Sequence, residues 1–353
     1  MKPKVLFFFN DLNCTGAEIL LFNFIKELNR RQSVEIGIVA LKEGGELVSQ
    51  VPSNIPIFYF EQSFNWKDKV DFKLGKDVLK SRLSKIYHKF PANIFYFNTI
   101  AQAGLLRFSK EFPVKNIFHV HELLYNFEFE KAENIHLIFE TIDHLICSST
   151  LVKNIFDKIF RNKITVINSV IKELASTTPL LNSKKSEKIK IISSGTICYN
   201  KGADTFLEIA QLLPKDRYEF IWLGKFLESG FSEILNLKNQ EGNWVKYIQT
   251  KSPDEYISLL NSADIFISLS RSESMGLVMM EAISLGIPVI ASNSGGAGLL
   301  VNNQNGKIVY DNRPEVFAQT IQDFSLEDFA KTNSVNLPFS YEEEFAKFEK
   351  LFS

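Results

Sequence analysis

Short apolar runs alternate with amphipathic, helix-like stretches along the whole chain, and this alternation constrains the fold more than any other feature. The strand-like runs of the first half are KVLFFF, EIGIVAL, IPIFYF, NIFYFN, NIFHVH and HLICSS. Those of the second half are KIKIISSG, YEFIWLG, KYIQT, DIFISLS, IPVIAS and GKIVY. Because strands that alternate with helices form parallel sheets, the sequence predicts an α/β protein with two Rossmann-like, doubly wound domains that face a cleft.

The chain has 353 residues, which is more than one typical hydrophobic core contains, so two domains are expected. We predict an N-terminal domain over 1–172 and a C-terminal domain over 188–338. The polar segment between them, 173–187, is the best candidate for a linker. The last residues, 339–353, carry apolar side chains at helical spacing and predict a C-terminal helix.

Composition excludes several classes of protein. The net charge of −1 argues against a globally electrostatic nucleic-acid-binding protein. The three cysteines form no zinc-binding spacing and no disulfide framework, which favours a reducing cytoplasm. The N-terminus reads as a first strand rather than a signal peptide. No apolar run approaches the ~18 residues of a membrane span, so we expect a soluble or at most peripheral protein.

Ligands of doubly wound sheets bind at the carboxyl ends of strands, so the residues that follow the predicted strands are the candidate site. After the first strand, Gly16 opens a helix whose N–H groups could approach an anion. A plain turn glycine is the alternative. No GxGxxG motif occurs at this turn, which weakens a dinucleotide-binding interpretation and a nicotinamide oxidoreductase.

The run FHVHE ends a predicted strand with two histidines. We expect His119 and His121 to point to opposite faces of that strand. His121, at the strand end, could enter a cleft between the domains, although a structural role stays open for it. His119 is interpreted as structural.

In SSGTICYNKGADTF, a strand and a glycine turn place Lys201 at the start of the next helix. An ammonium beside the positive end of a helix can hold a phosphate. The alternative is a solvated lysine.

The stretch SRSESMGLVMMEA follows another strand and contains two glutamates. A helix that starts near Gly276 leaves unpaired N–H groups over 274–277, which is an anion site suited to a diphosphate. Glu281 would lie just over one turn into the helix, where burial requires hydrogen-bond donors such as paired sugar hydroxyls. Glu273 would precede the helix. A capping role for Glu273 and a surface position for Glu281 are the alternatives.

The two glutamates, with the following SLGIPVIASNSGG, closely resemble the signature of glycosyltransferase family four. TGAE, HVHE, CSSTLVKNIF with VINSV, GTICYNKG and FSYEEEFAKFEKLF resemble further segments of that family in the same order. The resemblance implies a GT-B fold and a retaining, metal-independent enzyme that uses a nucleotide sugar. It also implies that the C-terminal helix returns to the N-terminal domain.

The resemblance implies roles for individual residues. Glu281 would accept hydrogen bonds from the two ribose hydroxyls, and Glu273 would contact the donor sugar. The distal phosphates would be held by the backbone amides of Ser274, Met275, Gly276 and Leu277.

Other residues would act beside these. Lys201 would neutralise the leaving diphosphate where other transferases use a divalent metal, and Gly16 would let the first loop approach it. His121 would hydrogen-bond the transferred sugar, and Asn168 would be structural.

Two positions depart from the family. Thr196, in the predicted donor site, stands where an arginine is expected, so one phosphate charge is uncompensated unless Arg271 or Lys225 replaces it. After Gly295 and Gly296 the chain reads AGLLV, where the family commonly has a glutamate.

The basic segment 67–90 has apolar residues at helical spacing, which is typical of an amphipathic helix. It could dock on anionic lipid if the acceptor is a lipid-linked saccharide, or it could be a Rossmann helix with a solvated lysine face.

We therefore predict a retaining glycosyltransferase that transfers a sugar from UDP-sugar or GDP-sugar to a saccharide or polyprenyl-linked acceptor. By family habit it serves surface polysaccharide, lipopolysaccharide, capsule or glycolipid assembly. It would need no cofactor or metal and would be cytoplasmic, either free or peripheral on the inner face of the plasma membrane. The main alternative is a non-catalytic partner subunit with the same fold. A nucleotide-sugar 2-epimerase with the same fold lacks support, because the first domain of this chain shows no clear set of acid and base carboxylates.

Overall fold

The computed structural model describes the chain except for residues 1, 61–76, 173–186, 228 and 328–336. It divides into two compact units. Unit 1 comprises Met1–Val170 and Tyr341–Ser353, and unit 2 comprises Ile171–Ser340. The predicted linker 173–187 lies almost entirely outside the described residues.

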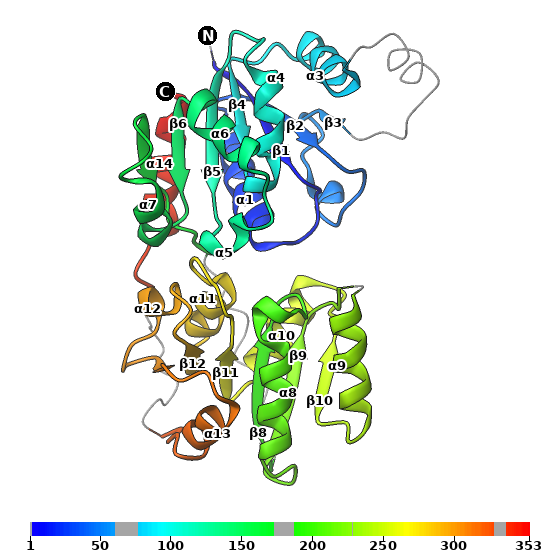
Figure 1. Ribbon diagram of the computed structural model, residues 1–353, viewed down its shortest axis with the longest axis vertical. Helices are drawn as coiled ribbons and strands as arrows, with labels where there is room; N and C mark the ends of the chain where they lie inside the picture. Colours follow the sequence, from blue (N-terminus) through cyan, green and yellow to red (C-terminus); the bar gives the residue numbers. More distant parts are fainter. Residues whose placement is uncertain (1, 61–76, 173–186, 228, 328–336) are drawn as a thin grey trace. The chain divides into compact units, whose positions relative to one another are not determined.

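Unit 1 is built on a parallel sheet with the strand order β3-β2-β1-β4-β5-β6-β7 (Figure 1). The strands are β1 (Lys4–Phe9), β2 (Glu35–Ala40), β3 (Ile57–Tyr59), β4 (Ile94–Phe97), β5 (Lys115–Val120), β6 (His144–Cys147) and β7 (Lys163–Val166). The sequence pattern did not predict β7, a four-residue strand at the edge of the sheet that is only partly buried.

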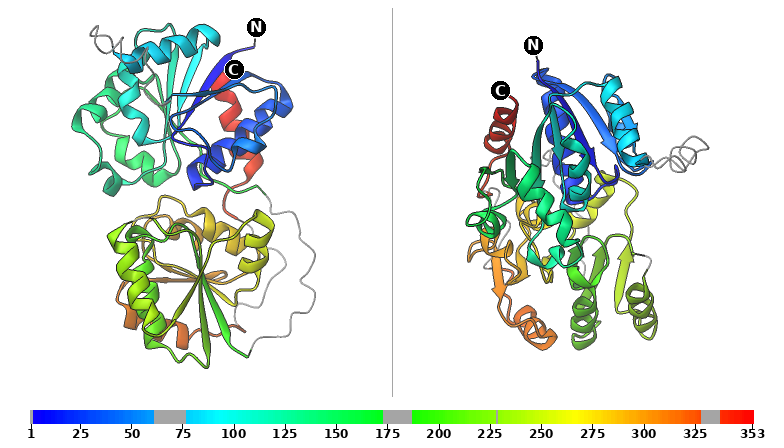
Figure 2. Two further views of the ribbon diagram at one scale, coloured as in Figure 1. Left: turned by 90° about the vertical axis from the view of Figure 1, so that its right-hand side faces the viewer. Right: turned by 45° about the horizontal axis from the view of Figure 1, so that its top comes forward.

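Helices cover both faces of this sheet (Figures 1 and 2). They are α1 (Gly16–Arg31), α3 (Val78–Lys89), α4 (Leu106–Ser109), α5 (Leu124–Phe127), α6 (Ala132–Thr141), α7 (Thr150–Phe156) and α14 (Tyr341–Glu349). Apolar residues of α3, α4, α6 and α7 form one core with the sheet. Aromatic residues of α1 and α14 pack on the opposite face.

The last helix belongs to unit 1, although it is the end of the chain. Phe348 of α14 is fully buried and contacts the rings of Phe7, Phe24 and Tyr96. The Glu344 carboxylate is also buried and accepts two hydrogen bonds of 2.9 Å from Asn168, one from its backbone N–H and one from its side-chain amide. Aromatic packing and this buried carboxylate therefore fix α14 to unit 1.

Unit 2 contains a second parallel sheet with the order β10-β9-β8-β11-β12-β13. Its strands are β8 (Ile189–Ser194), β9 (Tyr218–Leu223), β10 (Val245–Ile248), β11 (Ile265–Ser268), β12 (Val289–Ser292) and β13 (Gly306–Val309). Its helices are α8 (Ala203–Leu212), α9 (Gly230–Gln240), α10 (Pro253–Asn261), α11 (Leu277–Ser284), α12 (Ala297–Leu300) and α13 (Pro314–Gln322).

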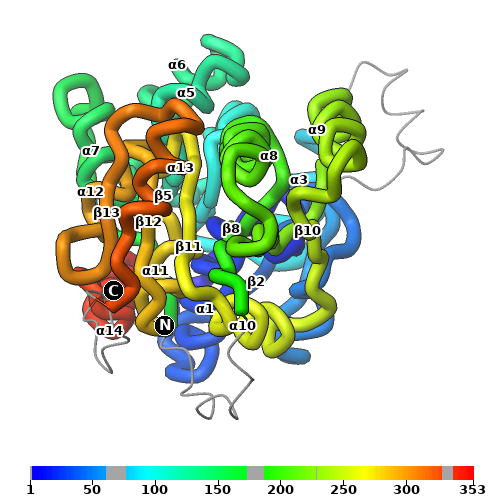
Figure 3. The backbone as a smooth tube through the Cα atoms, turned by 90° about the horizontal axis from the view of Figure 1, so that it is seen from below, coloured from blue at the N-terminus to red at the C-terminus, as the bar shows by residue number. Residues whose placement is uncertain are grey.

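Two layers of helices sandwich this sheet. Helices α8, α9 and α13 pack on one face, and α10, α11 and α12 pack on the other (Figure 3). Two parallel sheets with interleaved helices confirm the predicted doubly wound class.

Each sheet has one point at which the chain reverses its direction of growth. In unit 1 this point lies between β1 and β4, and in unit 2 it lies between β8 and β11. Loops that leave adjacent strands at such a point diverge to opposite faces and leave a crevice at the carboxyl ends. Topology therefore places a candidate site after β8 and β11, and another after β1 and β4.

The described part of the basic segment, 77–90, contains α3. Its apolar residues Val78, Leu83 and Ile86 are buried, and Leu83 and Ile86 belong to the unit 1 core. The apolar stripe of α3 is therefore not free to enter a lipid surface. Residues 67–76 lie outside the described part. None of the helices that the structure describes is long and apolar enough to span a membrane.

Candidate functional site

Three loops meet at the carboxyl edge of the unit 2 sheet. The backbone N–H of Glu273 donates to the Ser294 carbonyl at 3.0 Å, and the N–H of Gly296 donates to the Glu273 carbonyl at 2.7 Å. A Cβ on Gly296 would lie 2.7 Å from the backbone nitrogen of Met275, so only glycine permits this approach. The loop after β12 thus holds the loop after β11.

The loop after β8 joins the same edge. The Arg271 backbone N–H donates to the Asn200 carbonyl at 2.8 Å, and the Asn200 side-chain amide donates to the Ser272 carbonyl at 3.3 Å. Gly202 has a φ of 74°, and a Cβ there would collide with the Leu269 carbonyl oxygen. These contacts bring the end of the short 3-10 turn, Tyr199–Lys201, against the loop after β11.

Lys201 and Glu273 form an ion pair at this edge. Lys201 Nζ lies 2.6 Å from Glu273 Oε2, and the Ser270 hydroxyl lies 3.4 Å from the same oxygen. Their side chains are 28% and 13% exposed, so the pair is reachable from solvent but largely enclosed. Burial opposes the Lys201 charge, but the Glu273 carboxylate outweighs it and raises the pKa of Lys201. Lys201 therefore carries a positive charge at neutral pH.

The turn that opens α11 presents backbone donors beside this pair. Gly276 has a φ of 85°, a left-handed conformation that glycine adopts without strain, and it precedes the first helical residue, Leu277. The backbone N–H groups of residues 274–277 have no acceptor among the described residues. Met275 has its side chain in the core, so only its backbone remains for a ligand.

Glu281 is not a surface residue. It is half-buried on α11, and its Oε2 accepts a 2.6 Å hydrogen bond from the Tyr256 hydroxyl. The Tyr256 oxygen in turn accepts a 3.1 Å bond from Ser194 at the end of β8. Burial raises the pKa of Glu281 to about 7, while the Tyr256 hydrogen bond lowers it. Sequence reasoning missed Tyr256, because nothing in its helix marks it as different from a core aromatic.

Thr196 is exposed in the loop after β8. Arg271, one of its two proposed substitutes, already has other partners. Its guanidinium donates two hydrogen bonds to the Asp204 carboxylate, at 2.8 and 2.9 Å, and lies over the Tyr199 ring. Lys225 is exposed and has no ion-pair partner among the described residues. The Ile197 N–H donates to the Lys225 carbonyl at 2.9 Å, so Lys225 follows β9 directly beside Thr196.

The candidate residues of unit 1 meet at the carboxyl ends of β1, β4 and β5. His121 Nε2 lies 3.2 Å from the side-chain oxygen of Asn98, and the Asn98 amide donates to the Ala17 carbonyl at 3.2 Å. Ala17 follows Gly16 in the first turn of α1. A fully buried asparagine that sequence reasoning missed thus links His121 to the Gly16 turn.

The predicted orientation of the two histidines is wrong. The ring centroids of His119 and His121 lie 3.9 Å apart, because residues two positions apart in a strand share a face. His119 Nδ1 lies 2.7 Å from the Tyr96 hydroxyl, and its Nε2 is buried with no partner among the described residues. Burial lowers the pKa of His121 to about 3, so this imidazole is neutral at neutral pH.

Two enclosed carboxyl groups, those of Glu122 and Glu18, lie at the same edge. Glu122 accepts hydrogen bonds from the N–H groups of His121 at 2.9 Å and Ile100 at 3.2 Å, and burial raises its pKa to about 7. Glu18 is buried and accepts from the Thr15 hydroxyl at the helix start. These hydrogen bonds connect neighbouring loops. The T-x-x-E spacing of Thr15 and Glu18 matches a capping box, and this pattern could have predicted the position of Glu18 at the helix start.

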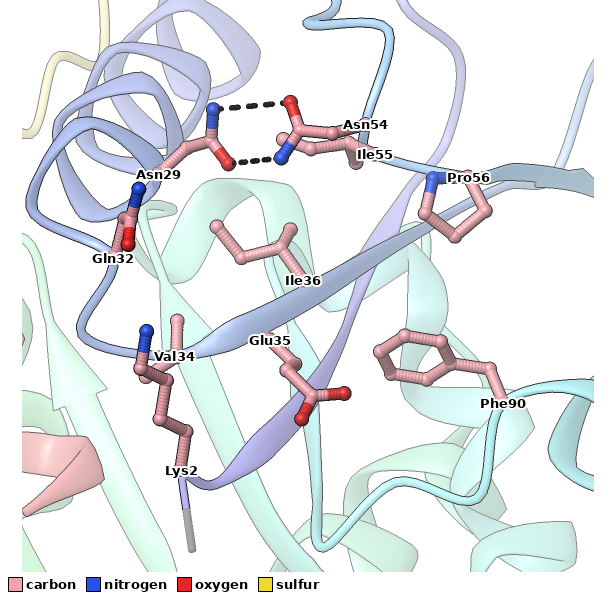
Figure 4. A pocket seen from close by; sticks show the side chains of 10 residues that line it. All are labelled: Lys2, Asn29, Gln32, Val34, Glu35, Ile36, Asn54, Ile55, Pro56 and Phe90. Carbon is pink, nitrogen blue, oxygen red and sulfur yellow. Dashed lines mark hydrogen bonds between the residues drawn. The ribbon is translucent and has the colours of Figure 1, made fainter.

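A hollow of about 570 Å³ lies elsewhere in unit 1 (Figure 4). Its lining includes Lys2, Glu35 and Pro56, which flank the amino ends of β1, β2 and β3. Asn29 and Asn54 exchange side-chain amide hydrogen bonds at its rim. The hollow is at the opposite edge of the sheet from the Gly16 and His121 loops.

The chain is similar to a known protein family over part of its length. Residues 181–335, less than half of the chain, match the family model of glycosyl transferases group 1. No curated protein sequence matches the chain.

Several solved structures share its fold. A structure of HepE from Anabaena, in complex with UDP and glucose, has a TM-score of 0.77 at 18% identity and covers 99% of this chain and 95% of its own. Sucrose-phosphate synthase from Thermosynechococcus elongatus has a TM-score of 0.79 at 15% identity, with 99% and 98% covered. WaaG, a glycosyltransferase involved in lipopolysaccharide biosynthesis, has a TM-score of 0.73 at 14% identity, with 99% of both chains covered. The chain therefore has the GT-B fold.

Proposed function

We propose that this protein is a retaining glycosyltransferase of family four that transfers a sugar from UDP-sugar or GDP-sugar. The observation that carries the proposal is the Lys201–Glu273 ion pair, which lies at the crevice of unit 2 beside the unpaired amides that open α11. The same unit contains the match to glycosyl transferases group 1. HepE, which shares the fold, was solved with UDP-glucose in one structure and with UDP in another.

The proposed reaction would develop negative charge beside Lys201 and the unpaired amides of 274–277. When the bond between the sugar and the β-phosphate breaks, the diphosphate gains negative charge and the sugar becomes oxocarbenium-like. Lys201 and the amides of 274–277 would stabilise the diphosphate, and each such donor is worth about 3 kcal/mol of barrier. On donor binding, Lys201 would exchange the Glu273 carboxylate for a phosphate oxygen, which frees Glu273 for the sugar hydroxyls.

Glu281 would accept the two ribose hydroxyls, and the acceptor would attack the face from which the diphosphate departs. We propose that turnover needs no divalent metal, because Lys201 and backbone amides supply the positive field. Gly16 and His121 belong to unit 1, and their contacts with diphosphate and sugar remain predictions. The neutral His121 imidazole suits a hydrogen bond to a sugar hydroxyl better than proton abstraction at neutral pH.

The missing arginine at Thr196 needs a substitute. We propose Lys225, because Arg271 already satisfies Asp204 and the Tyr199 carbonyl. Lys225 is exposed and follows the strand next to β8, so its flexible side chain can reach a phosphate beside Thr196.

The acceptor we propose is a saccharide or a lipid-linked saccharide of a bacterial surface polymer or glycolipid. Support comes from two structures of the same fold, WaaG and the lipopolysaccharide outer core galactosyltransferase WaaB. Docking on anionic lipid through 67–90 would have to use lysine and arginine side chains, since the apolar side of α3 is buried.

An assay of sugar transfer distinguishes a glycosyltransferase from a non-catalytic partner subunit. Purified protein would be incubated in EDTA with UDP- and GDP-sugars and an acceptor panel, and product anomers would be assigned by NMR. We expect a product that keeps the donor's anomeric configuration, and a fall in kcat of about 100-fold or more in Glu273→Gln. Nucleotide binding without any transfer by the parent would favour the partner subunit, and an inverted product would refute retention.

A further inference from the structure

A short hydrogen-bonded chain runs through unit 2 from β8 to α11. Ser194 donates its hydroxyl proton to the Tyr256 oxygen at 3.1 Å, and Tyr256 donates to Glu281 Oε2 at 2.6 Å. Because Ser194 occupies the acceptor side of the Tyr256 hydroxyl, the phenolic proton is directed at Glu281. The three residues come from the end of a strand, the first half of α10 and the middle of α11.

Tyr256 is the titratable group that faces Glu281. Helix α11 packs against β11, β12 and α12, whose residues include no titratable side chain. On α10, Asp254 and Glu255 are exposed at the helix start, and Glu255 accepts from the Lys251 N–H. In the described part of the chain, no lysine or arginine forms an ion pair with Glu281.

The Glu281 carboxylate is thus stabilised by the Tyr256 hydroxyl rather than by a lysine or arginine. Burial favours its protonated form, and the Tyr256 hydrogen bond favours the charged form. A protonated carboxyl group has one acceptor fewer than a carboxylate and carries no negative charge to strengthen the bonds it accepts. Two ribose hydroxyls therefore bind best when Glu281 is charged.

We propose that Tyr256 is a positioning residue for the nucleotide. Its hydroxyl fixes one carboxylate oxygen of Glu281 and favours the charged state, which leaves the other oxygen to receive the ribose. The inference rests on the proposed function, because it takes Glu281 as the ribose acceptor. It adds that nucleotide affinity depends on pH near neutrality through Glu281, and that Tyr256, which does not touch the nucleotide, sets the midpoint of this dependence.

The test compares Tyr256→Phe with the parent in calorimetric titrations of UDP at pH 6, 7, 8 and 9 in EDTA. In the parent, affinity should weaken as the pH falls below about 7, where Glu281 takes up a proton. Loss of the hydroxyl should move this midpoint upward by about one pH unit, since a hydrogen bond to a charged group is worth roughly that shift. Affinity should then fall about fivefold at pH 7 and return close to the parent value at pH 9.

A matched control is Tyr218→Phe. The Tyr218 hydroxyl is buried without a partner among the described residues, so its removal should leave the pH profile unchanged. Glu281→Gln, which cannot ionise, should bind UDP weakly at every pH.

The outcomes separate the two claims. If Glu281→Gln binds UDP like the parent, the ribose assignment of the proposed function fails. If Glu281→Gln weakens binding but Tyr256→Phe keeps the parent's midpoint, only the positioning role of Tyr256 fails. A Tyr256→Phe protein that loses the same affinity at all four pH values would also contradict the inference, because that is the result of a packing defect.

Discussion

Lys201 Nζ lies 2.6 Å from a carboxylate oxygen of Glu273, although 72 residues separate them in the chain. The pair forms because β8 and β11 are neighbours at the point where the unit 2 sheet reverses direction. Each residue is therefore carried to the same crevice by the strand before it. In the proposed function, donor binding would separate this pair, so that Lys201 contacts a phosphate and Glu273 contacts the sugar.

Replacement of Lys201 by methionine tests the cation. Lys201→Met keeps most of the side-chain volume and removes the charge, so kcat should fall by about 100-fold to 1,000-fold in the transfer assay. Lys246→Met is the control, because Lys246 is 67% exposed and pairs with Glu219 on β9. Equal losses in the two variants would contradict the role of Lys201.

The missing arginine gives a second prediction. Lys225→Ala should weaken UDP binding about fivefold, a size typical of an exposed charge pair. Thr196→Arg in the Lys225→Ala protein should restore the affinity, because the new guanidinium would come from the adjacent loop. Titrations at low and at 0.5 M salt measure both effects. Unchanged affinity in Lys225→Ala would show that another group supplies the charge or that none is needed.

The C-terminal helix should contribute strongly to the stability of unit 1. Phe348→Ala removes a fully buried ring that touches Phe7, Phe24 and Tyr96, so the free energy of unfolding should fall by about 3–5 kcal/mol. Phe129→Ala is the control, since Phe129 is 74% exposed and its loss should change stability by less than about 0.5 kcal/mol. Urea denaturation followed by fluorescence gives both values. A small loss in Phe348→Ala would mean that α14 is only loosely attached.

The half-buried carboxyl of Glu281 should make stability fall as pH rises. Its pKa is about 7 in the folded protein against 4.5 when exposed, so folding holds a proton that the unfolded chain has released between these values. Stability from this group is complete below pH 4.5 and is lost as the pH rises through about 7. Glu281→Gln should therefore gain stability relative to the parent between pH 4.5 and 7, by at most about 3 kcal/mol, and keep that gain above pH 7.

Denaturation at pH 5 and pH 8 measures this difference, with Glu208→Gln as the control because Glu208 is exposed on α8. A Glu281→Gln protein with the same advantage at both pH values would refute the proposed titration.

The alternation of strands and helices was enough to predict both parallel sheets, because buried parallel strands are continuous apolar runs. β7 was missed for the opposite reason: its four residues lie at an edge and are only partly buried. Glu273 and Lys201 could be predicted as site residues because each follows a strand. Their ion pair could not be predicted, because it depends on the order of the strands in the sheet, which local sequence patterns do not determine.

The roles of Tyr256 and Asn98 could not be predicted from the sequence. Tyr256 is a half-buried aromatic on an ordinary helix, and Asn98 acts through the carbonyl of Ala17, which has no sequence signature. The two histidines could have been placed correctly, because a period of two residues puts His119 and His121 on one face.

The central claim is that the crevice of unit 2 binds a nucleoside diphosphate, and the most direct test is a titration of UDP and GDP into the protein in EDTA at pH 8. We expect saturable binding of at least one nucleotide, weakened about tenfold or more by either Lys201→Met or Glu281→Ala, since each removes a charged hydrogen-bonding partner. Absence of binding by both nucleotides, or binding that neither substitution weakens, would contradict it.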